Sequence, residues 1–207
     1  MRRTAIALGC GVLVLAGCST DGPVQSSVRI DTGQAAVSDE FRISQSEVAD
    51  DVAQVLSGLG QPPGEPPAGL ASTTTQRLVQ ARLIESYAAT EGIELTRAQV
   101  QQGLEQLATE NGGRQALEDL ALQNGIPVEA LELTVRTNLL VTAIGEKLNP
   151  SGDPQAAGES ARVALSGYSE AIDVEVSPRY GTWDDARLLI IPGSSVTQPS
   201  GGEQAAQ

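Results

Sequence analysis

The residue types that most often carry out catalysis are scarce in this chain. It has no histidine, and its two cysteines are Cys10 and Cys18. The lack of histidine excludes catalysis by Ser–His or Cys–His pairs and metal binding through imidazole. Hydrolysis by carboxylates needs an Asp or Glu whose pKa is tuned by an apolar setting, and no acidic residue stands in such a setting. We therefore expect a protein that is not an enzyme and that uses no cofactor and no metal.

The N-terminus has the order of a secretory signal. Arg2 and Arg3 precede an apolar stretch over residues 5–15, and small residues follow it. The stretch is shorter than the roughly 20 apolar residues that a membrane-spanning helix needs. We therefore predict that residues 1–17 direct export and are then removed.

Cys18 has the most specific chemistry predicted for any residue of the chain. The sequence Leu15-Ala16-Gly17-Cys18 resembles the lipobox of bacterial lipoproteins, in which the cysteine thiol is alkylated by a diacylglyceryl group before cleavage. The alternative, a disulfide at Cys18, would need Cys10, which lies in the removed segment. The resemblance implies that two acyl chains on Cys18 anchor the protein to the extracytoplasmic face of the cell membrane, with residues 18–33 as a flexible tether.

Acidic residues outnumber basic residues by a wide margin. The chain has 13 Lys and Arg against 26 Asp and Glu, and its formal net charge is −13. Removal of residues 1–17 takes away two arginines and no acid, so the formal charge of the mature chain becomes −15. Such a charge repels nucleic acid and anionic lipid headgroups. We expect no nucleic-acid partner, and we expect the lipid anchor to provide the contact with the membrane.

Hydrophobic periodicity predicts a mainly α-helical domain over residues 34–191. We expect a bundle of five to six helices, whose ends are set by N-capping residues, prolines and glycines. These helices should begin at a capping box of Ser44 and Glu47, near Thr73, at a capping box of Thr96 and Gln99, shortly before Leu117, at Pro127 in a first helical turn, and at Asp153-Pro154. The candidate apolar faces include Leu59, Leu120 and Leu148.

The two ends of the domain carry candidate β-strands. Residues 35–37 and 41–43 flank a polar segment and predict a short hairpin or one extended segment. Val174 and Val176 alternate with polar neighbours, and residues 187–191 form a second candidate strand. We expect a small β element that pairs N-terminal and C-terminal strands. Residues 61–69, with four prolines and two glycines, are expected to be a plain connector, and residues 192–207 a disordered tail.

The order of these elements resembles the N-terminal domain of the SurA and PrsA type extracytoplasmic chaperones. The resemblance covers most of the mature chain and includes residues 43–48, residues 92–100, which begin Gly92-Ile93-Glu94-Leu95-Thr96, and residues 125–131. The most specific segment is Val174-Glu175-Val176-Ser177-Pro178-Arg179-Tyr180-Gly181-Thr182-Trp183-Asp184, which is similar to the closing motif of lipoprotein members of that family. The resemblance implies a chaperone scaffold.

The chain departs from the family at the point where many members carry parvulin-type prolyl isomerase domains. Only residues 149–154 separate Leu148 from Gln155, and this gap cannot hold a domain of that kind. The paired histidines typical of a parvulin site are also missing. Isomerase activity is therefore the least favoured function.

Arg179, Tyr180 and Trp183 are the candidate binding residues of the domain. Arginine and aromatic residues dominate binding hot spots, so one interpretation of these three residues is a client-binding corner. The structural alternative, which we favour, is that Tyr180 and Trp183 pack the C-terminal strand onto the helices while Arg179 pairs with an acid.

The resemblance and the composition together predict a function. We expect a lipid-anchored, ATP-independent protein that holds unfolded or partly folded exported polypeptides in a groove between helices, without catalysis. The main alternative is an interaction lipoprotein that docks one folded envelope partner.

Overall fold

The computed structural model describes residues 30–62, 64–150 and 152–193. Cys18, the predicted signal, most of the tether and residues 194–207 of the predicted tail lie outside these ranges. The described part is mainly α-helical, as predicted, and holds six α-helices. Its elements are β1 (Gln34–Val37), β2 (Arg42–Ser44), α1 (Gln45–Gly58), α2 (Leu70–Thr90), α3 (Arg97–Glu110), α4 (Arg114–Gln123), the 3-10 helix η1 (Val128–Ala130), α5 (Leu131–Leu148), α6 (Pro154–Ala171), β3 (Glu175–Val176), β4 (Thr182–Asp184) and β5 (Leu189–Ile191).

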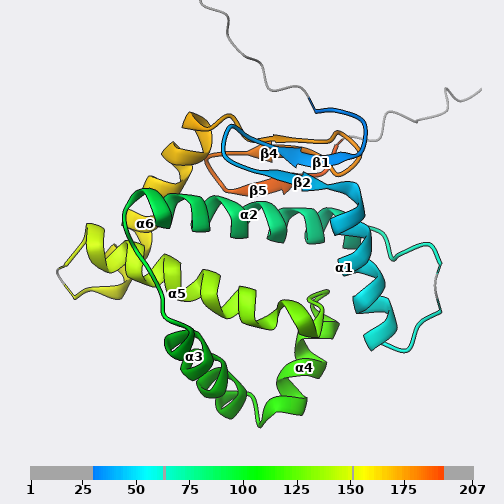
Figure 1. The fold of residues 1–207 in the computed structure, drawn as a ribbon, viewed down its shortest axis with the longest axis horizontal. Coiled ribbons are helices and arrows are strands. Elements are labelled where there is room, and N and C mark those ends of the chain that lie inside the picture. The colour runs from blue at the N-terminus through cyan, green and yellow to red at the C-terminus, as the bar shows by residue number, and fades with distance from the viewer. Residues whose placement is uncertain (1–29, 63, 151, 194–207) are drawn as a thin grey trace, which may run out of the picture.

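Helix α2 is the central element of the fold. In Figure 1 it lies between the strands on one side and α5 on the other, with α3 and α4 beyond α5. Leu78, Val79 and Leu83 of α2 belong to a core shared with the strands and α1. Ile84 and Ala88 belong to a second core shared with α5 and α6. Helix α2 is therefore buried on two faces, as expected for a helix in the middle of a layered domain.

Three helices begin at side-chain caps that the sequence predicts. The Oγ of Ser44 accepts from the backbone N of Glu47 at 3.0 Å at the start of α1. Thr96 and Gln99 form a complete capping box at α3, and Asp153 accepts from the backbone N of Gln155 at 3.0 Å at α6. Each cap satisfies backbone donors that the first helical turn leaves without an internal partner.

The first of these caps differs from the prediction in one detail. The carboxylate of Glu47 forms an ion pair with Arg82 of α2, with an N–O distance of 3.2 Å. This ion pair joins α1 to α2. The side-chain cap at the N-terminus of α1 is therefore Ser44 alone.

The strands join the two ends of the domain, as predicted. Strand β1 is antiparallel to β2, where Ala36 pairs with Ile43, and to β3, where Ala36 pairs with Val176. A second sheet is the hairpin of β4 and β5, in which Trp183 pairs with Ile190. Strand β5 lies within the predicted strand over residues 187–191, whereas β4 and the hairpin were not predicted. Its first strand has a single large apolar residue between Thr182 and Asp184, too short a pattern for a period of two to be recognised.

Several boundaries and faces differ from the sequence expectations. Helix α2 begins at Leu70, three residues before Thr73, because Gly69 adopts the left-handed backbone (φ 86°) that starts it without a side-chain cap. Pro127 precedes the 3-10 helix and does not lie in the first turn of α5. Three leucines expected on apolar faces are exposed: Leu59, Leu120 and Leu148, the second at 43%. Leu59 and Leu148 lie at helix ends, and α4 buries Leu117, Ala121 and Leu122 instead of Leu120.

Candidate functional site

Three polar side chains of α2 position the C-terminal segment. Ser72 donates to the carbonyl of Tyr180 at 2.6 Å. Gln76 accepts from the backbone N of Ile190 at 2.9 Å, and Gln80 donates to the carbonyl of Leu188 at 2.7 Å. Residues four apart lie on one face of a helix, so this polar stripe fixes the backbone of the last strands against α2. We did not identify it from the sequence, although polar residues at a spacing of four were a signal for it.

Trp183 lies in the core of the domain. Its side chain is 8% exposed and packs in the cluster formed by the strands, α1 and α2. The indole Nε1 donates to the Oγ of Ser169 at 2.8 Å and to Oδ1 of Asp185 at 3.1 Å. Buried indoles usually find such a partner for their N–H. This position is the one expected from the structural alternative for Trp183.

Arg179 and Tyr180 lie elsewhere, at the edge of a groove beside α1. Arg179 is exposed, and its Nη1 donates to Oε1 of Gln45 at 2.8 Å. Among the described residues Arg179 has no ion pair with an acid, and its partner is the neutral amide of Gln45. Tyr180 is half-buried against the core. The structure thus separates the three candidate residues into one core side chain and two at a groove.

This α1 groove has a volume of about 960 Å³. The buried side chains of Val48, Val52 and Leu56 form its base, and the exposed Ala49 and Ala53 lie along the same face of α1. Its other described lining residues are Gln45, Ser46, Ser57, Gly60, Gln61, Pro62, Gly64, Pro66, Ala71, Arg179 and Tyr180. None of the residues described as lining it is acidic, and only Arg179 carries a charge. In a chain with 26 acidic residues, this is a largely apolar surface whose described lining includes no acid.

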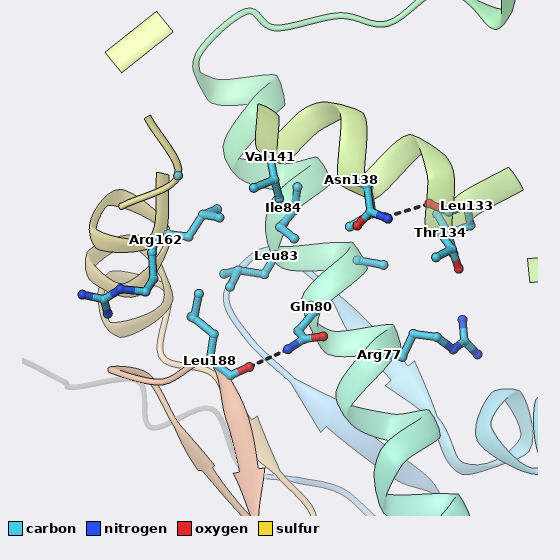
Figure 2. A pocket seen from close by; sticks show the side chains of 14 residues that line it. Arg77, Gln80, Leu83, Ile84, Leu133, Thr134, Asn138, Val141, Arg162 and Leu188 are labelled. Carbon is cyan, nitrogen blue, oxygen red and sulfur yellow. Dashed lines mark hydrogen bonds between the residues drawn. The ribbon is translucent and has the colours of Figure 1, made fainter. Parts of the chain in front are cut away.

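A second cavity, the α2–α5–α6 pocket, lies on the other side of α2 (Figure 2) and has a volume of about 310 Å³. Its apolar lining includes Leu83, Ile84, Leu133, Val141, Leu165 and Leu188. Arg77 and Arg162 lie at opposite ends of it (Figure 2), and each already has an acidic partner. Arg77 pairs with Asp51, and Arg162 pairs with Glu159 at 2.6 Å.

The pair of Arg162 and Glu159 lies at the surface of α6. The hydrogen bond from Arg162 lowers the pKa of the Glu159 carboxyl. Both side chains are more than half exposed, so water screens the pair and its effect on stability is small. Each arginine of the second pocket therefore has an acidic partner, while Nε of Arg77 is buried without a hydrogen-bond partner.

No group of three or more His, Cys, Asp or Glu side chains among the described residues is arranged to hold a metal ion. The hydroxyl of Ser169 is fully buried and donates to Asp185 at 2.5 Å, which makes it a structural group. None of the described helices is both long and apolar enough to span a membrane.

Comparisons with protein-family models, characterised proteins and solved structures find no match to this chain. The similarity to SurA and PrsA type chaperones therefore stays a prediction from the sequence motifs. The functional interpretation depends on those motifs, on the α1 groove and on the α2–α5–α6 pocket.

Proposed function

We propose that this protein is a lipid-anchored extracytoplasmic lipoprotein that holds unfolded or partly folded exported polypeptides without ATP and without catalysis. The observation that carries the proposal is the α1 groove, an open apolar surface without acidic lining residues in a strongly acidic chain. Unfolded polypeptides differ from folded ones in exposing apolar side chains. A groove of this kind can bury such side chains, and burial of apolar surface is the main driving force for association.

Charge supports the same function. The acidic residues elsewhere keep the protein soluble and separate from its copies, so an apolar groove can stay open without causing self-association. Arg179, which no acid neutralises among the described residues, lies at the edge of the groove with Tyr180. An arginine next to an aromatic residue is a frequent pair at binding surfaces. This corner is therefore the proposed client-binding part of the groove.

The experiment measures whether the groove suppresses aggregation. The lipoprotein is reconstituted in phosphatidylcholine vesicles, and light scattering is followed while each of three unrelated proteins unfolds in its presence. We expect protection of all three by the wild type and a severalfold loss of protection in Ala53→Glu. A charge at this position would have to be desolvated when an apolar client binds.

Gln54→Glu is the matched control for this substitution. Gln54 is the next residue of α1, is also exposed, and is not among the residues that line the α1 groove. It receives the same new charge, so its protection should stay at the wild-type level. Equal protection by the two variants would remove the groove from the mechanism. Protection of none of the three proteins, with tight capture of one folded envelope protein, would favour the docking alternative.

A further inference from the structure

Leu188 has an unusual backbone for its residue type. Its φ of 55° is left-handed, and Asp173 (φ 53°) is the other non-glycine residue with a positive φ in the described part of the chain. Asp visits this region readily, because its short polar side chain can form local hydrogen bonds, whereas a leucine there is strained. Strained residues that persist in a fold cluster at ligand sites and switch regions.

Two backbone hydrogen bonds hold Leu188 in this conformation. Its N–H donates to the carbonyl of Asp184 at 2.7 Å, within the turn between β4 and β5. Its carbonyl accepts from Nε2 of Gln80 at 2.7 Å (Figure 2). The result is that the leucine side chain points from the hairpin into the α2–α5–α6 pocket, which it lines. An aliphatic side chain from a distant part of the sequence thus already occupies part of this pocket.

The lining of the pocket disfavours cationic groups. None of the residues described as lining it is Asp or Glu, and its two arginines are paired with Asp51 and Glu159. The hydroxyls of Thr134 and Thr137 donate to carbonyls of their own helix at 2.9 and 2.8 Å. A cationic ligand group would therefore meet no acidic side chain in the lining and would lose its water.

The pocket also has room beyond the side chain of Leu188. Its volume of about 310 Å³ is at the lower end of the range of small ligand sites, roughly 300 to 1,000 Å³. Gly158 of α6 lines it, and a Cβ built on Gly158 would meet no heavy atom within 4 Å. The carboxamide of Gln80 also lines it; it donates to the carbonyl of Leu188, and once Leu188 is displaced it can exchange hydrogen bonds with a peptide backbone instead. This feature favours a polypeptide over a lipid chain as the occupant.

We propose that the α2–α5–α6 pocket is a second binding site, which takes an uncharged aliphatic side chain presented by an extended polypeptide, and that this side chain displaces Leu188. The inference rests on the proposed function for the kind of molecule that binds, a polypeptide, but it does not use the α1 groove. Displacement lets Leu188 exchange its hydrogen bonds to Asp184 and Gln80 for bonds to water and leave its left-handed backbone, so strain is released when the ligand binds. The site therefore selects leucine-like side chains over cationic ones.

The test uses methyl NMR of the lipoprotein in nanodiscs, with an acetylated and amidated peptide of alternating leucine and serine as the probe. We expect the peptide to shift the methyl signals of Leu83, Ile84 and Val141. A peptide with lysine in place of leucine should leave them unchanged. Gly158→Leu fills the pocket and should weaken binding at these signals by at least tenfold. Gly167→Leu, on the same helix at a glycine with equal space that does not line the pocket, should bind as the wild type does.

Two further variants test the role of Leu188. Leu188→Gly removes both the strain and the competing side chain, so the probe should bind on the order of tenfold more tightly. Asp173→Gly relieves the other left-handed backbone, lies outside the pocket, and should leave the affinity unchanged. If Leu188→Gly does not fold, Gly158→Leu still decides the question.

The possible failures can be told apart. Shifts at Val48 and Val52 without shifts at Leu83, Ile84 and Val141 would overturn the second site and leave the α1 groove intact. Shifts at neither set would count against polypeptide binding altogether. Binding that Gly158→Leu does not weaken, or equal binding of the lysine peptide, would overturn the proposal. The proposal would also be overturned if octanol, a model of a lipid chain, shifted the methyl signals of Leu83, Ile84 and Val141 and the leucine peptide did not.

Discussion

Replacement of Trp183 is the sharpest test of whether the C-terminal motif, residues 174–184, packs in the core or binds clients. Trp183→Ala removes an indole that is 8% exposed and donates to Ser169 and Asp185. Loss of a buried tryptophan from a core typically costs about 3 to 5 kcal/mol of the free energy of unfolding. Total stabilities of single domains are about 5 to 15 kcal/mol. The substitution should therefore remove a large part of the stability of this domain.

The expected change in melting temperature follows from that cost. For a domain of this size, 1 kcal/mol corresponds to roughly 2 to 4 °C, so Trp183→Ala should melt about 6 to 20 °C lower. Trp183→Phe keeps most of the apolar contact but loses the N–H donor, and should cost a smaller amount, about 1 to 3 kcal/mol. Circular dichroism melts measure both changes. Because Trp183 is the single tryptophan of the chain, its emission in the wild type should be blue-shifted and should move to the red on unfolding.

Arg179→Ala is the matched control from the same motif. Arg179 is exposed and its side chain bonds to Gln45, so the melting temperature should change by no more than about 2 °C. The reasoning would be refuted if Trp183→Ala melted like the wild type while protection of unfolding clients fell. That outcome would make Trp183 a binding residue.

Further predictions concern the closure of the fold, helix packing, the anchor and catalysis. Ending the chain after Ile172 removes β3, β4 and β5 and should abolish the cooperative melt, whereas deletion of residues 193–207 should leave it unchanged. In urea titrations Gly145→Ala should destabilise by about 1 to 3 kcal/mol, because its Cβ would lie 2.6 Å from the carbonyl oxygen of Ala157. Gly167→Ala should stabilise by about 0.5 to 1 kcal/mol. If Gly167→Ala were instead less stable than Gly145→Ala, the close contact of α5 with α6 at Gly145 and Ala157 would be contradicted. Cys18→Ser should release the protein from the membrane fraction or leave its precursor uncleaved, and unchanged processed protein in membranes would disprove lipidation. Prolyl isomerisation should not be accelerated in a protease-coupled assay, and a rate that rises with protein concentration would restore the isomerase hypothesis.

Local interactions made much of the fold predictable from the sequence. Ser44, Thr96 and Asp153 cap helices through bonds to backbone groups two or three residues away, so a short stretch of sequence contains both partners. The hairpin of β1 and β2 is local in the same way. The lack of histidine and the net charge of −13 follow from composition alone. The predicted lipid site at Cys18 rests on a sequence motif and lies outside the described residues.

The tertiary structure decided which helix each part of the C-terminal segment, residues 174–191, contacts. Ser72 and Gln80 bond to Tyr180 and Leu188 across 108 residues of sequence, and no local pattern specifies such pairs. These contacts help to place Tyr180 at the α1 groove and to direct Leu188 into the second pocket, while Trp183 packs in the core. The physical reason is that a side chain becomes buried or exposed according to what packs over it, and here the covering element is distant in the chain.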